Sequence, residues 1–540
     1  MKEFAVADCE TDPFKKGRTD IAPFVWGFYD GTIYKKFDTT KEFIDFVTPL
    51  DIILYAHNGG KFDWFFIIDY LEEFSELMII NGRLSKFKIG NCEFRDSYNI
   101  LPVPLAAYKK DEISYDIFEK DERVKPKNKR EIEKYLQSDC IYLYQLVEHF
   151  ISNYGNGLTL AGSAMKFWQK KFNNKAPKTS EYFYKEFKQF YYGGRVECSE
   201  SGIIRREFSV VDINSAYPEA MKHLHPYSTV YTESNVLPKS RAYISRSFII
   251  LNCVSDGAFP FREKEGLEFP HDNICRRYAI TGWEYLAAID NGALSDVEII
   301  SVFSFADSRE CGEYIDHFYA LKTESERDSA PYIIAKLFLN TLYGKFGSNP
   351  EEYMEYTISH PEHIVNAATD GYHYSDMLGP WALMQKQLDE EKQHYFNVCV
   401  AASITGYVRA ELFKARRLCK GVIYCDTDSI AATDVSALEM SETKLGAWKL
   451  EAVCDWAAIA GKKMYCFSKK EGTYNLKKGK YKKATKGARL SIKQVYSVAK
   501  GVPQLYEPIA PTFSLKRGIK IVNKLITKNA KIDKNVKDEK

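Results

Sequence analysis

Short apolar runs that end in acidic residues recur along this chain. The runs at 422–423 and 430–432 flank the polar centre Asp426-Thr427-Asp428-Ser429, a pattern that predicts a strand, a tight turn and a second strand. Asp426 and Asp428 stand two residues apart in an extended segment, so their side chains share one face. Like charges this close repel each other, and a cation such as Mg²⁺ offsets the repulsion. The same spacing is common in solvated turns, so the pair alone identifies no site.

The first 155 residues show an α/β pattern. Strand-like runs alternate with helical runs, at 4–7, 52–55, 64–74 and 131–150. Asp8 and Glu10 alternate on the first strand and therefore share a face. Tyr135 and Asp139 are four residues apart on a helix and share another.

A helix is predicted between Ser329 and Gly344. Ser329 is a suitable N-cap, Pro331 suits the first turn, and Gly344 can end the helix. Lys336, Asn340 and Tyr343 are separated by four and three residues, which puts them on one polar face. A polar face with one cation suits a triphosphate.

The charge is segregated although the formal net charge is only +2. Residues 462–540 hold 22 Lys and Arg against 5 Asp and Glu, and aromatic residues alternate with these lysines at Tyr465, Phe467, Tyr474 and Tyr481. A basic, aromatic segment of this kind favours contact with a nucleic-acid backbone. The bland alternative is a solvated lysine-rich face, which we prefer for the tail at 528–540.

Composition excludes several classes of protein. The 12 cysteines form no C-x-x-C pair or Cys/His cluster, which argues against a disulfide framework or a zinc site. No apolar run approaches the roughly 20 residues of a membrane span. We therefore expect a reducing compartment and no membrane partner.

Three segments resemble motifs A, B and C of family B DNA polymerases, in the chain order of that family: 211–218, 336–344 and 424–429. Three more resemble the motifs of its 3′–5′ proofreading exonuclease: 8–11, 58–63 and 135–139. Residues 191–194 (Tyr-Tyr-Gly-Gly) resemble the element that holds single-stranded template between the two domains, with a plain hinge as the alternative. The long gaps between motifs resemble the protein-primed subgroup of small linear genomes.

The resemblance implies a multidomain α/β and α+β fold, in which an RNase H-like exonuclease precedes a right-hand polymerase with two insertions. The expected boundaries are 1–155 for the exonuclease, 156–256 for the first part of the palm, 257–315 for a terminal-protein insertion, 316–347 for the fingers, 348–398 for an insertion that supports processivity, 399–490 for the second part of the palm, and 491–540 for the thumb and basic tail.

For polymerisation, the resemblance implies two metal ions per site, with Mg²⁺ expected and Mn²⁺ able to substitute. The expected metal-binding positions are Asp212, Ile213 and Asp428, with Asp426 beside them. The positions expected to bind the incoming nucleotide are Ile213, Tyr217, Lys322, Lys336, Asn340 and Tyr343, and Tyr217 is expected to exclude ribonucleotides. The positions expected to bind DNA are Tyr191, Gly193, Gly194, Thr427, Lys463 and Tyr465.

For the exonuclease, the resemblance implies the same two-metal chemistry with water as nucleophile. The metal ligands are Asp8, Glu10 and Asp139, and the other catalytic residues are Asp63, Tyr135 and Lys110. Single-stranded DNA is expected at Thr11, Tyr55, His57, Asn58 and Phe62, since aromatic rings provide stacking surfaces.

The main hypothesis is a proofreading, strand-displacing DNA polymerase that replicates a linear viral or plasmid genome. Its partners are primer–template DNA, single-stranded DNA, dNTPs and a terminal priming protein, and it is a monomer in the cytoplasm of the host cell. One alternative is a family B polymerase that extends ordinary primers or starts without one. Another, of a different class, is a DNA-binding replication scaffold without chemistry.

Overall fold

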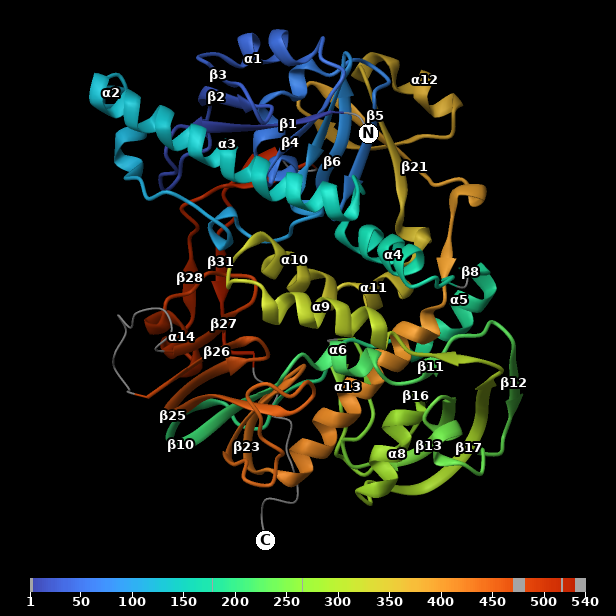
Figure 1. Ribbon diagram of the computed structural model, residues 1–540. Helices are drawn as coiled ribbons and strands as arrows, with labels where there is room; N and C mark the ends of the chain where they lie inside the picture. Colours follow the sequence, from blue (N-terminus) through green and yellow to red (C-terminus); the bar gives the residue numbers. More distant parts are fainter. Residues whose placement is uncertain (1–2, 177, 265, 470–480, 516–517, 530–540) are drawn as a thin grey trace.

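The computed structural model describes residues 3–176, 178–264, 266–469, 481–515 and 518–529. Its N-terminal part is built on a ten-stranded sheet with the order β20-β21-β19-β5-β6-β7-β4-β1-β2-β3 (Figure 1). The strands are β1 (Phe4–Thr11), β2 (Pro23–Tyr29), β3 (Tyr34–Phe37), β4 (Ile53–Ala56), β5 (Glu76–Ile80), β6 (Arg83–Ile89), β7 (Cys92–Asp96), β19 (Met354–Ser359), β20 (His373–Leu378) and β21 (Trp381–Gln387).

Helix α3 (Pro126–Tyr154) crosses this sheet and packs on β1 and β2. Pro126 starts the helix, where a missing N–H has no cost, and Gly155 follows its end with a φ of 79°. Leu136, Leu143 and Val147 recur at helical spacing and are buried against the strands. This packing brings Asp139 of the helix to the strand that carries Asp8.

Three strands of the segment expected to be the second insertion extend the N-terminal sheet. Strand β19 pairs antiparallel with β5, with Tyr356 opposite Leu77. Ile358 and Leu383 are buried in the same core as the N-terminal strands, and Figure 1 shows the gold strand β21 beside the blue ones. The sequence carried no sign of this pairing, because strand partners far apart in the chain leave no local pattern.

The two segments expected to form the palm contribute a seven-stranded sheet, called the palm sheet below, with the order β27-β26-β25-β10-β24-β23-β9. Its strands are β9 (Val196–Cys198), β10 (Gly202–Ile213), β23 (Lys420–Asp426), β24 (Ser429–Asp434), β25 (Trp448–Gly461), β26 (Met464–Ser468) and β27 (Tyr481–Thr485). Helix α13 (Val398–Leu418) is buried along most of its length and packs on β23, β24 and α6 (Ala216–Met221).

A four-stranded sheet with the order β12-β17-β13-β16 lies beside the palm. It consists of β12 (Tyr231–Ser234), β13 (Phe248–Ser255), β16 (Cys275–Thr281) and β17 (Leu294–Phe305), with helix α8 (Gly282–Asp290) and the hairpin β14 (Phe261–Glu263) and β15 (Gly266–Glu268). Two of its strands precede residue 257, the expected start of the first insertion. That boundary was inferred from the distance between motifs, which says nothing about strand pairing.

The segment expected to form the fingers, 316–347, contains most of α9 (Gly312–Glu324) and all of α10 (Ala330–Leu339) and α11 (Leu342–Phe346). Ser329 caps α10 and Pro331 lies in its first turn, as predicted. The prediction of one helix as far as Gly344 is wrong, since the helix breaks at Asn340. The Asn340 side chain donates to the carbonyl of Lys336 at 2.8 Å and Thr341 donates to that of Leu337 at 2.6 Å, and such local bonds compete with helical ones.

The C-terminal part returns to the N-terminal domain. It contains α14 (Ile492–Ala499), β28 (Gln504–Tyr506), β29 (Thr512–Ser514), β30 (Gly518–Lys520) and β31 (Lys524–Ile526). Leu515 is buried in the N-terminal core, and the ring centroid of Phe513 lies 5.0 Å from that of Phe62. The segment that carries Phe513 and Leu515 is therefore packed against the N-terminal domain.

The remaining elements are short connections or surface helices. They are α1 (Thr40–Val47), α2 (Lys120–Arg123), α4 (Leu160–Lys171), α5 (Glu181–Phe187), α7 (Arg241–Ile244), α12 (Ile364–Thr369), β8 (Lys178–Thr179), β11 (His225–Pro226), β18 (Ser308–Arg309) and β22 (Tyr395–Phe396). Among the described residues, no helix has the length and apolar character needed to cross a membrane.

Candidate active sites

Two carboxylates meet at one edge of the palm sheet. Asp212 is near the end of β10, and Asp428 lies in the turn between β23 and β24. The two are joined through the backbone, because the N–H of Ile213 donates to the carbonyl of Asp428 at 2.8 Å. Burial, then the charge of Asp428, raises the pKa of Asp212 to about 7. Burial, then Asp426, raises the pKa of Asp428 to about 6. A divalent cation would offset the repulsion between these carboxylates, and hard cations such as Mg²⁺ prefer oxygen ligands of this kind.

The turn that presents Asp428 is held by the Gly-Gly element. Thr427 has a φ of 61°, and its N–H donates to the carbonyl of Arg195 at 2.6 Å. A Cβ on Gly194 would lie 2.8 Å from the Thr427 side chain, whereas one on Gly193 would meet open space. Gly194 is therefore needed for packing under the turn. Gly193 is the position of the element that stays accessible.

A lysine-containing turn closes the other side of the carboxylates. Lys463 Nζ lies 2.7 Å from Asp426 Oδ1, and the Tyr465 ring is stacked on Phe467 with centroids 4.3 Å apart. Sequence reasoning missed Lys482 of β27. Burial lowers the pKa of Lys482, while Asp212 and Asp428 act in the opposite direction. Its only sequence signal was its place in the basic segment. Tyr474 and most of the basic tail lie outside the described residues.

The fingers residues face the same edge. The rings of Tyr217 and Tyr343 are parallel, with centroids 4.5 Å apart. Lys336 and Asn340 are exposed. Burial, then the charges of Lys336 and Lys449, lowers the pKa of Lys322, so both of these lysines lie near Lys322. Tyr191 packs beside Gly347 at the end of α11.

Four acidic residues form a second cluster in the N-terminal domain. Ligand oxygens of Asp8, Glu10 and Asp139 lie within 4.8 Å of one another. Burial and the neighbouring carboxylates raise the pKa of Asp8. Burial, then Asp139, raises the pKa of Glu10 to about 8, and burial raises that of Asp63 to about 7. The buried oxygens Asp63 Oδ1 and Asp139 Oδ1 have no hydrogen-bond partner among the described residues. Acceptors orphaned in this way fit a divalent cation.

A cation and two phenols border this cluster. Lys110 Nζ donates to Asp139 Oδ2 at 3.1 Å and lies 5.3 Å from the centre of the Tyr135 ring. The hydroxyls of Tyr135 and Tyr115 are 3.5 Å apart. Tyr135 lies one turn before Asp139 on α3, so the helix positions both.

Of the residues expected to bind single-stranded DNA, three line a cavity of about 310 Å³ above the carboxylates. These are Thr11, Asn58 and Phe62. Tyr55 does not line this cavity, because it lies in the core, where the residue is 1% exposed. His57 is also committed elsewhere, because its two ring nitrogens are hydrogen-bonded to Ser97 Oγ at 3.0 Å and the carbonyl of Val103 at 2.7 Å. Both residues neighbour the site in sequence but belong to the scaffold beneath it.

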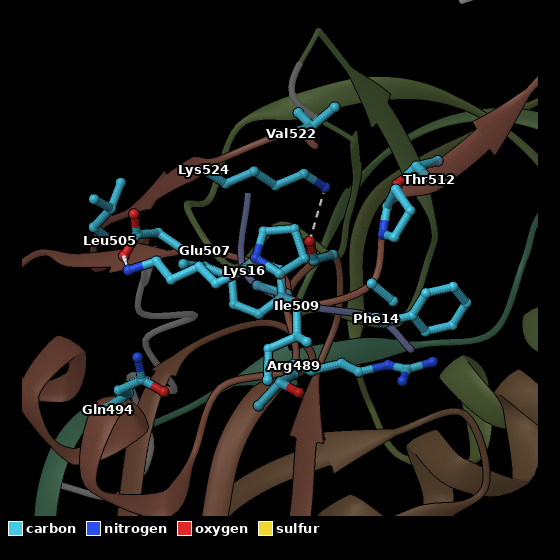
Figure 2. Close-up of a pocket in the computed structure, with 17 residues that line it drawn as sticks. Phe14, Lys16, Arg489, Gln494, Leu505, Glu507, Ile509, Thr512, Val522 and Lys524 are labelled. Atoms are coloured by element: carbon cyan, nitrogen blue, oxygen red, sulfur yellow. Dashed lines mark hydrogen bonds and ion pairs between the residues drawn. The ribbon is translucent and has the colours of Figure 1, made fainter. Parts of the chain in front are cut away.

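Phe14 lines this cavity and also a larger one of about 840 Å³ between the N-terminal domain and the C-terminal part. Lys16 bridges the two parts through Glu507 at 2.7 Å. Figure 2 shows the side chains of Phe14 and Arg489 extending in the same direction in this cavity. Sequence reasoning missed Phe14, since a lone exposed aromatic carries no pattern.

Comparison with known proteins gives a consistent result. Residues 103–415 match the family described as DNA polymerase type B, organellar and viral. A DNA-directed DNA polymerase of Enterobacteria phage PRD1 is 38% identical over 479 residues, covering 86% of this chain and 82% of the relative. A DNA polymerase of Bacillus phage phi29 is 27% identical over 504 residues, covering 81% of each. In a solved structure, phi29 DNA polymerase complexed with primer-template DNA and incoming nucleotide substrates has a TM-score of 0.75 at 21% identity, over 98% of this chain and 100% of that one.

These similarities define a DNA-directed DNA polymerase. The chain belongs to the type B DNA polymerases of organelles and viruses. The family predicted from the motifs is confirmed, and so is the predicted fold class, because the phi29 structure shares it over nearly the whole chain. The scaffold alternative is thereby set aside.

Proposed function

We propose that this polymerase extends DNA at the palm site and degrades it in the 3′–5′ direction at the N-terminal site. The observation that carries the proposal is the presence of two separate carboxylate clusters on two different sheets, at Asp212/Asp428 and at Asp8/Glu10/Asp139. Each is bordered by a lysine, Lys463 in the first and Lys110 in the second. Two such clusters suit two phosphoryl-transfer reactions.

At the palm site, Asp212 and Asp428 would hold divalent cations, and we propose two Mg²⁺ ions, with Mn²⁺ able to substitute. When bound, these ions supply charge neutralisation at the reacting phosphate. The backbone of Ile213 fixes the separation of the two carboxylates through its bond to Asp428. The Tyr217 ring, which is stacked on that of Tyr343, packs against the sugar of the incoming nucleotide. Lys336 and Lys322 bind its phosphates. Lys463 and Tyr465 hold the primer terminus.

At the N-terminal site, Asp8, Glu10 and Asp139 would hold cations of the same kind, with Asp63 beside them. Burial raises the pKa of Asp139 and Lys110 opposes that rise, so Lys110 favours the ionised form of Asp139 and would also neutralise charge on the scissile phosphate. Tyr135 orients the attacking water. Thr11, Asn58 and Phe62 bind the single-stranded end, which approaches past Phe14 through the larger cavity.

We propose protein priming and strand displacement because of the subgroup that the motif spacing resembles. The partners are then primer–template DNA, a displaced single strand, dNTPs and a terminal protein, and the enzyme acts as a monomer in the host cytoplasm. The expected domains stand as proposals too, with the segment 348–398 attached to the exonuclease rather than free of it. Extension of ordinary primers remains the alternative.

The test uses a labelled primer–template with Mg²⁺, with and without dNTPs, resolved on a denaturing gel. The wild type should extend the primer with dNTPs and shorten it without them. Asp428→Ala should lose extension alone, and Asp8→Ala with Asp63→Ala should lose shortening alone. Loss of both activities in either variant contradicts two separate sites. Transfer of a labelled nucleotide to a protein from the same replicon, without a nucleic-acid primer, separates protein priming from the alternative.

A further inference from the structure

Three lysines from three elements converge beside the palm carboxylates. Lys322 is in the last turn of α9, Lys336 is in the last turn of α10, and Lys449 is on β25. Lys449 stands directly opposite Asp212 in the antiparallel pair β10 and β25. Residues that face each other in this way project from the same face of the sheet. Lys449 therefore lies on the carboxylate face of the palm.

A hydrogen bond joins the fingers to the loop that leads into β25. The Tyr319 hydroxyl, one turn before Lys322, donates to the carbonyl of Thr443 at 2.7 Å. Helices α9 and α10 pack against each other. The charges of Lys336 and Lys449 both lower the pKa of Lys322. Each of these two ammonium groups is thus near enough to repel that of Lys322, and a polyanion bound beside Lys322 would relieve that repulsion.

The contacts of these lysines leave them available to a ligand. Lys449 Nζ lies 2.7 Å from Glu442 Oε2, and their side chains are 44% and 67% exposed, so the pair is weak and exchangeable. Within the described ranges, neither Lys322 nor Lys336 has a carboxylate at ion-pair distance. Lys322 instead lies 5.5 Å from the centre of the Tyr319 ring.

We propose that Lys449 is a third, palm-borne ligand of the triphosphate of the incoming nucleotide, and that Glu442 holds it until the nucleotide arrives. The inference rests on the proposed roles of Lys322 and Lys336. In the reaction the primer 3′-hydroxyl gives its proton to water, and its oxygen bonds to the α-phosphorus while the bond from the α-phosphorus to the bridging oxygen breaks. The electron pair leaves with pyrophosphate, and Lys449 neutralises the charge that develops there. Since β25 is paired with the strand that carries Asp212, Lys449 keeps its place relative to the carboxylates.

The test is single-nucleotide incorporation on a primer–template by the full-length enzyme. Lys449→Ala is compared with Lys449→Arg and with Lys336→Ala. Lys444→Ala, on the loop that leads into β25, serves as the control. Lys449→Ala should raise KM for dNTP and the inhibition constant of pyrophosphate about tenfold, the loss expected for one charge-assisted bond at an exposed site. Lys449→Arg should recover most of this, and Lys444→Ala should change neither. Glu442→Gln should lower KM in the wild type and have no effect once Lys449 is Ala.

Two further measurements decide what a change means. Affinity for primer–template without dNTP, and the rate of 3′–5′ degradation, should both be the same in Lys449→Ala and the wild type. A parallel loss of DNA affinity would make Lys449 a DNA contact and overturn the inference. If Lys336→Ala raises KM and Lys449→Ala does not, the inference fails while the proposed function stands. If neither raises it, the assignment of the triphosphate site itself fails.

Discussion

Removal of the Glu10 carboxylate should change how the stability of the N-terminal domain depends on pH. In the metal-free protein the pKa of Glu10 is raised from 4.5 to about 8, by burial first and then by Asp139. The folded state therefore keeps a proton that the unfolded state loses. The free energy of unfolding must fall as pH rises through this interval.

The size of the effect follows from the two pKa values. One pKa unit corresponds to about 1.4 kcal/mol, so between pH 6 and 8.5 Glu10 alone removes about 2–3 kcal/mol of stability. For a domain of this size, that is a fall in melting temperature of about 5–10 °C. Glu10→Gln should lose this part of the slope and be the more stable protein at pH 8.5.

Calorimetry of the metal-free full-length chain at pH 6, 7 and 8.5 measures the difference. Glu148→Gln, which changes an exposed acid on α3 of the same domain, serves as the control and should melt like the wild type at each pH. Added Mg²⁺ should restore the wild type at pH 8.5 more than it restores Glu10→Gln. Equal pH slopes in the wild type and Glu10→Gln would refute the reasoning, because Glu10 would then hold no extra proton in the folded state.

Three further outcomes are expected. Lys110→Ala removes the cation 3.1 Å from Asp139, so the pKa of Asp139 should rise and the pH profile of 3′–5′ degradation should move to higher pH, while Lys110→Arg should keep it. Phe513→Ala should cost about 3–5 kcal/mol of local packing against Phe62 and slow degradation of single strands in gel assays, with the exposed Val502→Ala as control and primer extension unchanged. Deletion of 348–398 should lower the melting temperature and solubility of the whole chain, since it uncovers β5 and its core; a deletion variant as stable as the wild type would contradict the shared sheet.

The parts of the site that lie on one element could be predicted from the sequence. Asp426 and Asp428 sit in a polar break between two apolar strands, and Tyr135 and Asp139 on one helical face, so local periodicity was enough. Only the family resemblance predicted that motifs far apart in the sequence would meet in one site. Nothing in the chain's composition placed Asp212 opposite that turn.

Long-range packing explains the positions of Tyr55 and His57. Tyr55 is buried in the core cluster to which α3 contributes, and the bonds of His57 depend on residues at 97 and 103. The break at Asn340 has a local cause, because its side chain bonds to the carbonyl of Lys336, which periodicity cannot reveal. Lys449 and Lys482 were hidden for a different reason, because any one lysine in a lysine-rich chain looks like the others.

The pairing of β5 with β19 also constrains how the chain is made on the ribosome. The partner of β5 is synthesised roughly 270 residues later, which at ~5–20 residues per second is a wait of roughly 15–60 s. During that time β5 is the open edge of an otherwise finished sheet, and open edges recruit other chains. The nascent N-terminal domain must therefore be shielded until residue 359 has left the exit tunnel, so slow decoding between 80 and 354 should reduce the yield of active enzyme.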